Sequence, residues 1–521
     1  MTTTSATHAA SHVASHAATA SPHAATAVQA IDYAAIAPPL ALALTACAVL
    51  LLDAFLPHSS RSSHGPSVRG ALGFTALAGV IAAGALLVAQ AVHGGTLSTF
   101  CVPEPAACSY VVDHITLVFG GLTLVAGVVV ILMSMGQLSD GDIPVGEWYF
   151  LLLCALIGAI TLPASRDLVM LVVALELVSL PVFALTALRR YDGRASEAAV
   201  KLFLVSVVST AITLFGISLL YGASGTLHLS HIAGGLAKSP IPEAHGVVTA
   251  AVMLVIAGFA FKVAAVPFHS WAADVYQGAS VPVAALLSVI SKAAGFAGLI
   301  LVLAVTRPLY SEVWVPVVAV LAALTMTIGN LLAMRQRHAV RLLAWSSVAQ
   351  SGYILAPLGV GPEGAGAAVV YLVFYAAMNL GAFAVAMLVA RGGSLADYRG
   401  LVFRRPAAAL ALAFFLVCLA GLPPGLAGLF AKVAVFRELV DGGVGWLAVV
   451  MAVNTVIGLY YYVTWAAALF TPAPAPVEAR EAPAVRLAPV AVGVAVSVVI
   501  TVVFSVAPQV VFDAGLLSAL G

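Results

Sequence analysis

Charged residues are scarce in this sequence: only 8% of its 521 residues are Asp, Glu, Lys or Arg, against about 25% in soluble globular chains. This scarcity excludes a soluble protein, because too little charge is available to cover its surface. Hydrophobic residues make up 62% of the chain. Runs of about 20 apolar residues, the length that crosses a bilayer, recur from Ala34 to Asp513. We therefore predict an all-α integral membrane protein with about 14 transmembrane helices.

Several cofactor motifs are also missing. The sequence has no Gly-rich phosphate loop, no CxxC pair and no nucleotide-binding fingerprint, so we expect no cofactor in this chain and no nucleic acid among its partners. Three of the five cysteines lie within apolar runs and are interpreted as small hydrophobic residues. Cys101 and Cys108 share one polar loop, and their spacing leaves both a disulfide and two free thiols open.

The apolar runs divide the chain into five segments. A tail of Ser, Thr, Ala and His is followed by spans 1 to 3, spans 4 to 8, spans 9 to 13, and a loop with span 14. The predicted boundaries are 1–33, 34–145, 146–305, 306–470 and 471–521. The tail lacks the basic residues that begin a signal peptide. Its histidines at positions 8, 12 and 16 have no carboxylate or thiolate nearby to complete a metal site.

The loops between the runs differ in charge and so predict an orientation. Fourteen Lys and Arg residues fall in loops on one side and four on the other. Because positive residues accumulate on the cytoplasmic side, we expect both termini outside the cytoplasm. The four basic residues on the outer side are Arg166, Lys238, Arg307 and Arg437.

Four lysines remain, and each falls within an apolar run: Lys201, Lys262, Lys292 and Lys432. Every arginine, by contrast, lies in a loop or at the end of a span. Arginine effectively cannot release its proton, whereas a buried lysine can. Glu176 stands alone in the middle of the fifth span, where an ionised carboxylate is costly unless it is paired or protonated. This division of residue types is what a proton path requires.

Two predicted helix breaks accompany these lysines. In the seventh span Pro267 lies between Lys262 and His269, and a proline there frees the backbone carbonyl of Val263. In the twelfth span the break precedes the lysine and consists of Pro423, Pro424 and Gly425. Transporters use broken helices beside ionisable residues at their ion sites. The separation of the two breaks by five spans suggests an internal repeat of spans 4 to 8 onto spans 9 to 13.

Three of these features also have plainer interpretations. Glu176 could be a neutral, hydrogen-bonded carboxyl that joins two helices. Lys201, near the cytoplasmic start of the sixth span, could extend its side chain to the interface. Pro267 could bend its helix only to improve packing. The combination of these residues favours the functional interpretation.

Five stretches carry a family resemblance. LELVSLPVFAL, GFAFKVAAVPFHSWAADVYQGA, RLLAWSSVAQSGY, GLPPGLAGLFAKVAVF and NTVIGLYYYV resemble the antiporter-like membrane subunits of respiratory complex I, most closely subunit N of bacterial NADH:quinone oxidoreductase. The resemblance covers roughly residues 110–470. It implies fourteen helices with two inverted five-helix repeats, each containing a broken helix, and a polar, hydrated axis in mid-membrane.

The resemblance also implies a role in proton transfer for six residues. Glu176 and Lys262 match the paired acid and lysine of one half-channel, and Lys292 matches the central connecting lysine. His269 matches a histidine near that lysine, Lys432 matches the ionisable residue on the exit side, and Lys201 matches a further lysine of this subunit type. Gln350 stands where many relatives have histidine, which puts a relay step through that position in doubt.

The leading hypothesis is a cofactor-free, proton-translocating subunit of an NADH:quinone oxidoreductase in the bacterial cell membrane. NADH, FMN, iron–sulfur clusters and quinone are then expected in partner subunits. Those partners would be other antiporter-like and quinone-site membrane subunits and peripheral redox subunits, with lipid around them. One alternative is a subunit of a multi-subunit sodium/proton antiporter, and another is a membrane scaffold whose buried charges only join helices.

Overall fold

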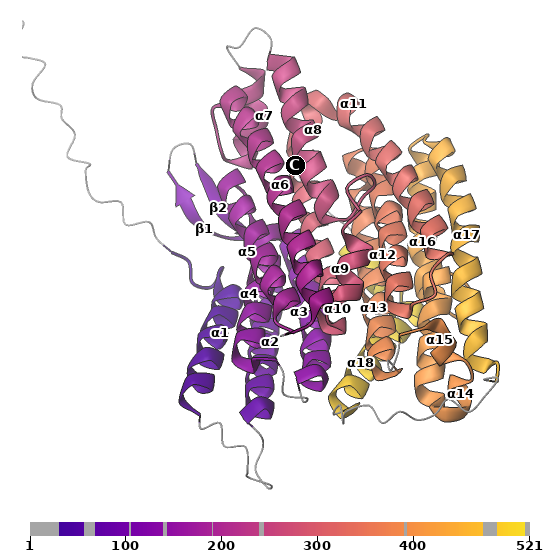
Figure 1. Cartoon of the computed structure of the whole chain (residues 1–521). Coiled ribbons are helices and arrows are strands. Elements are labelled where there is room, and N and C mark those ends of the chain that lie inside the picture. Colours follow the sequence, from indigo (N-terminus) through magenta and orange to yellow (C-terminus); the bar gives the residue numbers. More distant parts are fainter. Residues whose placement is uncertain are drawn as a thin grey trace, which may run out of the picture.

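The computed structural model describes residues 31–56, 68–103, 106–138, 143–189, 191–238, 244–389, 393–472 and 487–515. Helices make up most of this part of the chain (Figure 1). The predicted tail, apart from its last three residues, lies outside the described residues.

The first part of the chain forms six long helices, a hairpin, a short helix and a seventh long helix. They are α1 (Ala37–Phe55), α2 (Val68–His93), β1 (Leu97–Val102), β2 (Ala107–Val112), α3 (His114–Gln137), α4 (Val145–Ala164), α5 (Leu168–Ala187), α6 (Gly193–Ser224), α7 (Leu229–Ala237) and α8 (Ala244–Lys262). Asp113 and Asp167 cap α3 and α5, because their carboxylates accept hydrogen bonds from backbone N–H groups of the first turn.

The second part begins after a break and is again mostly helical. Its helices are α9 (Ala272–Gly278), α10 (Val281–Leu286), η2 (Leu287–Ser291), α11 (Lys292–Ala333), α12 (Ala339–Leu355), η3 (Ala356–Gly359), η4 (Pro362–Gly364), α13 (Ala365–Val389), η5 (Leu395–Tyr398), α14 (Leu401–Arg404), α15 (Pro406–Ala420), α16 (Leu426–Asp441), α17 (Gly445–Phe470), α18 (Leu487–Val506) and α19 (Gln509–Ala514).

Many of these helices are long enough to span a membrane. Within the described residues, 12 helical stretches are long and apolar enough to cross a bilayer. The two other expected spans correspond to α12, which has 17 residues, and to the pair α15 and α16, which is interrupted. The total of fourteen and the inverted repeats stay predictions.

Three features differ from the sequence-based expectations. The predicted loop around Cys101 and Cys108 is an antiparallel hairpin in which these two residues are paired across the strands, whereas the described chain is otherwise helical, as the predicted fold class requires. The helix α7 was not predicted. The boundary expected at 305/306 separates two membrane-spanning stretches, Val281–Thr306 and Tyr310–Ala333, but the continuous helix α11 joins them where a loop was expected.

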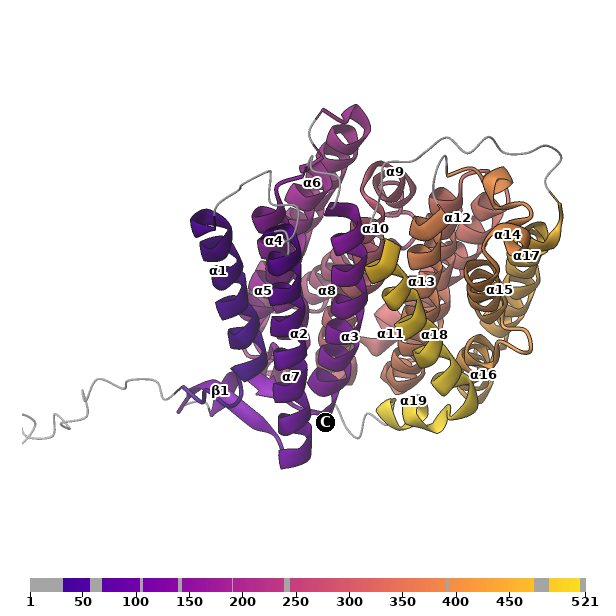
Figure 2. The same ribbon diagram turned by 90° about the horizontal axis from the view of Figure 1, so that it is seen from below.

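The helices pack closely where small residues allow it. A Cβ atom on Gly158 of α4 would lie 2.6 Å from the backbone nitrogen of Val178 in α5, so only glycine permits this approach. In Figure 2, α1 to α8 lie on one side and α12 to α17 on the other, with α10 and α11 between them. The central helical stretch from Val281 to Thr306, formed by α10, η2 and the start of α11, contains an 18-residue window that is completely buried.

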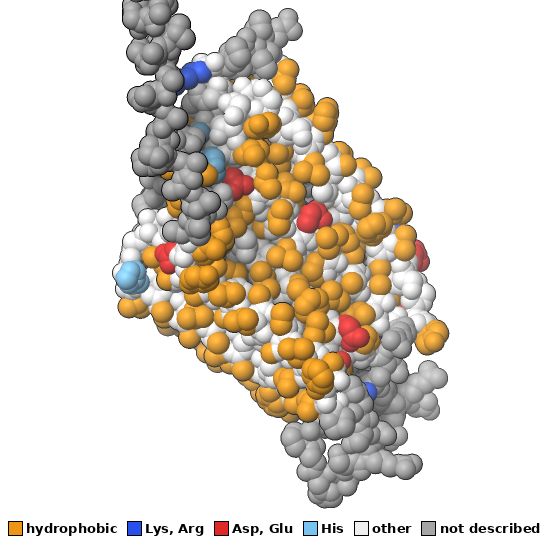
Figure 3. All heavy atoms as spheres, turned by 90° about the vertical axis from the view of Figure 1, so that its left-hand side faces the viewer, with side chains coloured by type: hydrophobic (Ala, Val, Ile, Leu, Met, Phe, Trp, Pro, Cys, Tyr) orange, Lys and Arg blue, Asp and Glu red, His pale blue; other side chains and the backbone are white. Residues whose placement is uncertain are grey.

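The outer surface is largely apolar. Hydrophobic side chains cover most of the face shown in Figure 3, with few charged groups among them. Exposed Val, Leu and Phe side chains of α6, such as Phe203, Leu204 and Val208, belong to this kind of surface. A surface of this composition is suited to lipid or to neighbouring membrane helices.

Candidate functional site

The first predicted break is confirmed, and it begins directly after Lys262. Helix α8 ends at this residue, and the next helix, α9, starts at Ala272. Lys262 is partly buried, and its Nζ donates a hydrogen bond to Ser179 Oγ of α5 at 2.7 Å. Glu176 lies one turn before Ser179, and its Oε1 accepts a hydrogen bond from Thr210 of α6 at 2.6 Å. The acid and the lysine expected in one half-channel are thus neighbours across α5 and α8.

The backbone of this break is satisfied by side chains from the second part of the chain. The carbonyl of Val263, which the sequence predicted to be freed, accepts a hydrogen bond from Ser351 Oγ of α12 at 2.6 Å. The N–H of Val266 donates to Thr325 Oγ1 of α11 at 2.9 Å. Irregular backbone at membrane depth persists where the protein itself provides such partners. Pro267 follows Val266 through a cis peptide bond.

Lys292 lies at the centre of the molecule, with only 1% of its surface exposed. It follows a π-helical turn, Leu287–Ser291, a local widening that often occurs at functional sites. Its Nζ donates to the carbonyl and the hydroxyl of Ser347, at 2.5 and 2.7 Å, and lies 5.7 Å from the centre of the Tyr375 ring. The described contacts of this ammonium group are therefore all with neutral groups.

The second break is confirmed between α15 and α16, at residues 421–425. Pro423, Pro424 and Gly425 form it, as expected. Lys432, which is 8% exposed, donates a hydrogen bond to the carbonyl of Ala420, the last residue of α15, at 2.6 Å. Its Nζ also lies 5.6 Å from the centre of the Tyr353 ring. Lys432 thus reaches back across the break to the helix that precedes it.

Neutral polar side chains occupy the space between the two lysines Lys292 and Lys432. Gln350 donates to Tyr462 OH at 3.2 Å and accepts from Tyr371 OH at 2.7 Å. Ser346 and the same Tyr462 hydroxyl are 2.5 Å apart. The ring of Tyr371 stacks on that of Tyr353, which faces Lys432. Gln350 therefore bridges two tyrosine hydroxyls.

Lys201 differs from the expectation of a buried lysine. Its side chain is 44% exposed, and its Nζ forms ion pairs with Glu197 at 2.7 Å and with Asp274 at 3.2 Å. The expectation of burial was wrong because the exposed side of α6 carries this residue, and an apolar run does not reveal which side of a helix faces outward. The proton-transfer role of Lys201 stays a prediction.

His269 packs its ring against Trp345 of α12, with ring centres 5.5 Å apart. In the described part of the chain, no hydrogen bond joins His269 to Lys262 or Lys292. A link through this histidine would need water or a movement of the side chain.

The sequence did not identify the direct partners of the lysines. Ser179, Ser347 and the carbonyl of Ala420 are neutral groups, and serines are common in apolar helices. The paired serines in the stretch AWSSVAQS were the one available signal, because four polar residues in eight are unusual for a membrane helix. Among the described residues, no group of three or more His, Cys, Asp or Glu side chains could hold a metal ion.

Two broken membrane helices, each bearing a lysine, and a third lysine buried between them define an antiporter-like membrane subunit. Comparison with known proteins supports this class. The family described as NADH:quinone oxidoreductase/Mrp antiporter, transmembrane, matches residues 165–458. The chain belongs to this family.

Individual relatives of this chain are proteins named subunit N. The chain is 52% identical to NADH-quinone oxidoreductase subunit N 2 of Streptomyces griseus, over 90% of this chain and 87% of the relative. It is 44% identical to NADH-quinone oxidoreductase subunit N of Salinispora tropica, over 93% of this chain and 99% of the relative.

Solved structures show the same fold. A chain of respiratory complex I from Thermus thermophilus, determined with bound aureothin, matches with a TM-score of 0.71 and 30% identity, covering 91% of this chain and 98% of that chain. A chain of the Mrp complex from Dietzia matches with a TM-score of 0.79 and 22% identity, covering 92% and 96%. At 22% identity, the match to the Mrp complex shows a shared fold and nothing more.

Proposed function

We propose that this chain is the proton-translocating subunit N of a bacterial NADH:quinone oxidoreductase. It would work without a cofactor of its own, and other subunits would bind NADH, FMN, iron–sulfur clusters and quinone. Identities of 52% and 44% to proteins named as this subunit support the assignment. The single observation that carries the proton path is Lys292, an ammonium group 1% exposed between two broken helices.

In this proposal the proton passes along Glu176, Lys262, Lys292 and Lys432. A lysine held by neutral partners loses and regains its proton without breaking a strong ion pair, because a serine hydroxyl or a carbonyl contributes less than a carboxylate. A charge that arrives at one site acts on the next by Coulomb interaction, which is strong where water is scarce. Water and the hydroxyls of residues such as Ser347 and Tyr462 would connect the sites.

The decisive experiment replaces Lys292 in the complete complex. Lys292→Met removes the protonatable group, and Lys292→Arg keeps the charge but holds its proton permanently. We expect both variants to lose NADH-driven proton pumping and coupled NADH:quinone electron transfer by at least about 10-fold, with assembly checked on native gels. Lys238→Met, at an exposed position near a loop, is the matched control. Unchanged pumping in the Lys292→Met complex would refute the proposed path.

The alternative of a sodium/proton antiporter subunit shares the fold, as the likeness to the Mrp complex indicates. Purification of the native complex separates the two. Peripheral redox subunits that copurify with the chain would support the oxidoreductase, and sodium-dependent proton exchange without NADH would support the antiporter.

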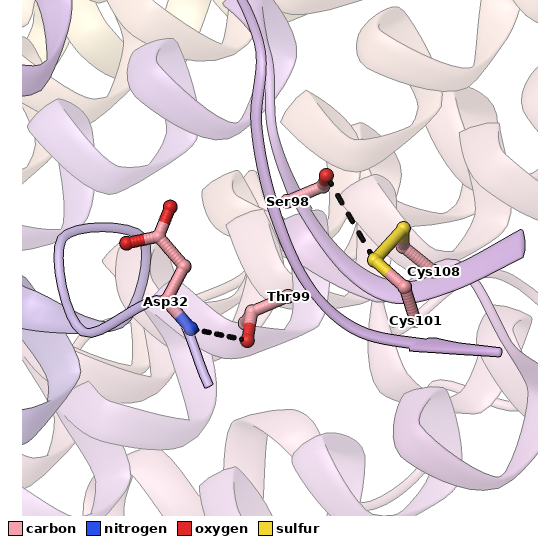
Figure 4. Close-up of a disulfide and its surroundings, with 5 residues drawn as sticks. All are labelled: Asp32, Ser98, Thr99, Cys101 and Cys108. Carbon is pink, nitrogen blue, oxygen red and sulfur yellow. Dashed lines mark hydrogen bonds between the residues drawn. A yellow bond between two sulfur atoms is a disulfide. The ribbon is translucent and has the colours of Figure 1, made fainter. Parts of the chain in front are cut away.

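We also propose that both termini face the outside of the cytoplasm. The hairpin, the start of α1 and the last described helix, α19, lie at one end of the helices: the N–H of Asp32 donates to Thr99 in β1 (Figure 4), and His114 at the start of α3 has its ring nitrogen 3.2 Å from the carbonyl oxygen of Ala514. The hairpin carries a disulfide between Cys101 and Cys108 (Figure 4). Disulfides persist in oxidising compartments such as the bacterial exterior, which agrees with the charge bias of the loops.

A membrane-impermeant maleimide tests this orientation. After mild reduction of intact cells, the reagent should label Cys101 and Cys108, and it should not label them before reduction. Labelling that appears only after the cells are opened would place the hairpin inside.

A further inference from the structure

A second group of charged side chains lies apart from the row of lysines, around the short helix α9 that follows the first break. Asp274 of α9 is placed between two cations. Its Oδ1 accepts a hydrogen bond from Arg341 of α12 at 2.8 Å, and its Oδ2 accepts one from Lys201 of α6 at 3.2 Å. One carboxylate therefore connects three helices that are distant in sequence. Glu197 completes the group through its ion pair with Lys201.

The attachment of α9 to these neighbours is close. Arg341 also donates to the side chain of Gln277 at 2.9 Å, so the first turn of α12 is fastened to α9 at two residues. At the end of α9, a Cβ atom on Gly278 would lie 2.6 Å from Cβ of Ala198 in α6. A helix of seven residues is too short to be stable alone. Its position depends on these contacts.

The same contacts reach the central lysine through α12. Arg341 and Ser347 lie on this one helix, roughly 9 Å apart along its axis at 1.5 Å per residue. Ser347 provides both hydrogen-bond acceptors of Lys292. A shift of α12 relative to α9 would therefore change the contact on which the proposed proton path depends.

We infer that Asp274 is a positioning residue for proton transfer: its carboxylate, shared by Arg341 and Lys201, holds α9 against α12 so that Ser347 meets Lys292. This inference rests on the proposed function. The link is electrostatic and lies near the starts of α6 and α12, and in the isolated chain the side chains of Asp274, Arg341 and Lys201 are 38%, 32% and 44% exposed. Dissolved ions therefore weaken it, whereas they hardly affect the buried lysines.

The test uses the complete complex with Asp274→Asn, Arg341→Gln and the double variant. The matched control is Asp441→Asn, which removes a carboxylate from an exposed ion pair with Arg437 within a single helix. NADH-driven pumping and electron transfer are measured at about 20 mM and about 300 mM salt, where the screening lengths differ severalfold. Native gels report assembly.

We expect Asp274→Asn to lower pumping about 3- to 10-fold at low salt, and the double variant to lose no more than the worse single variant, because paired residues act as a unit. High salt should lower pumping in the native complex and in Asp441→Asn, and should change Asp274→Asn little. A purely structural role would reduce assembly without removing the response to salt.

Native pumping and a native salt response in assembled Asp274→Asn would overturn the inference, as would additive losses in the double variant. If Asp274→Asn does not assemble, Arg341→Gln removes the same bridge from the α12 side and is judged by the same criteria. The proposed function is tested separately by Lys292→Met. If Lys292→Met is inactive while Asp274→Asn is normal, the positioning role of Asp274 is refuted and the proposed function stands.

Discussion

The two broken helices hold their lysines in different ways. Lys262 is the last residue before its break and contacts a side chain of another helix, Ser179. Lys432 follows its break and contacts the backbone of the preceding helix, at Ala420. The acid Glu176 lies one turn before Ser179 on the same helix, α5. Within the described residues no carboxylate forms an ion pair with Lys432.

We propose that this difference reflects two means of stabilising the charge of a lysine in the membrane. Near Lys262 the counter-charge is a carboxylate, which can itself be protonated. Near Lys432 it is the carboxyl-terminal end of α15, whose last carbonyls carry a partial negative charge that favours a cation. The first site can therefore be neutralised by its own acid, whereas the second depends on a fixed dipole. Four experiments sharpen or break this comparison.

The largest effect is expected from exchanging each lysine for glutamate. Lys262→Glu places a second carboxyl near Glu176, and like charges in a poorly hydrated site are unfavourable, so pumping should fall at least about 10-fold. Lys432→Glu should lose no more than about 3-fold, because a protonated carboxyl can donate to the carbonyl of Ala420. NADH-driven pumping of the assembled complexes measures both. Equal losses at the two positions would contradict the proposed difference.

A smaller effect is expected from Ser179→Ala, which removes the acceptor of Lys262. A buried polar group left without its partner costs about 1–3 kcal/mol, and pumping should decrease about 3- to 10-fold. Ser179→Thr keeps the hydroxyl and should restore most of the rate. The control is Ser218→Ala, since Ser218 is exposed and bonds only within its own helix. If Ser179→Ala pumps normally, this hydrogen bond is unimportant for Lys262.

Glycine substitutions should affect stability more at the second break than at the first. Gly421 has a φ of 80°, and an added Cβ would lie 3.0 Å from Cδ of Lys432, so Gly421→Ala should cost about 1–2 kcal/mol from the left-handed backbone alone. Gly295 is helical, and its added Cβ would lie 3.0 Å from Cγ of Lys262. Gly295→Ala should cost less, because the gain in helix propensity offsets the contact. Thermal unfolding of the purified complex compares them.

Gly84→Ala in α2 is the control for these variants, because nothing lies within 4 Å of its added Cβ, and a gain of about 0.5–1 kcal/mol is expected. A larger loss in Gly295→Ala than in Gly421→Ala would reverse the comparison of the two breaks.

The smallest effect is expected at the junction between α11 and α12, where His338 precedes α12, the helix whose Ser347 and Tyr353 contact Lys292 and Lys432. Burial, together with the positive charges of Arg194 and Arg341, lowers the pKa of His338 below its usual value. The neutral ring therefore contributes stability that is fully present above about pH 6.5 and is lost as the pH falls through the lowered pKa of the folded state.

Thermal unfolding at pH 7.5 and 5.5, on either side of about pH 6.5, measures this contribution. The native protein should lose more stability on acidification than His338→Asn does. If both lose the same amount, His338 contributes nothing to the pH dependence.

The predictable parts of this molecule follow from local sequence. The prolines at 267, 423 and 424 broke helices where expected, because a missing N–H acts within one turn. The membrane spans followed from the length of apolar runs. The hairpin at Cys101 was not predicted, because its strands are only six residues each.

By itself the sequence determined the membrane class, the positions of the two breaks and the lysines beside them, since hydropathy and backbone chemistry are properties of short segments. Only the tertiary structure decided that Lys201 is exposed and paired with Asp274, that Lys262 meets Ser179, that Lys292 meets Ser347, and that Lys432 meets Ala420. The physical reason is that an apolar helix in lipid can be rotated about its axis at little hydrophobic cost. Packing against distant helices then fixes which of its polar groups face each other.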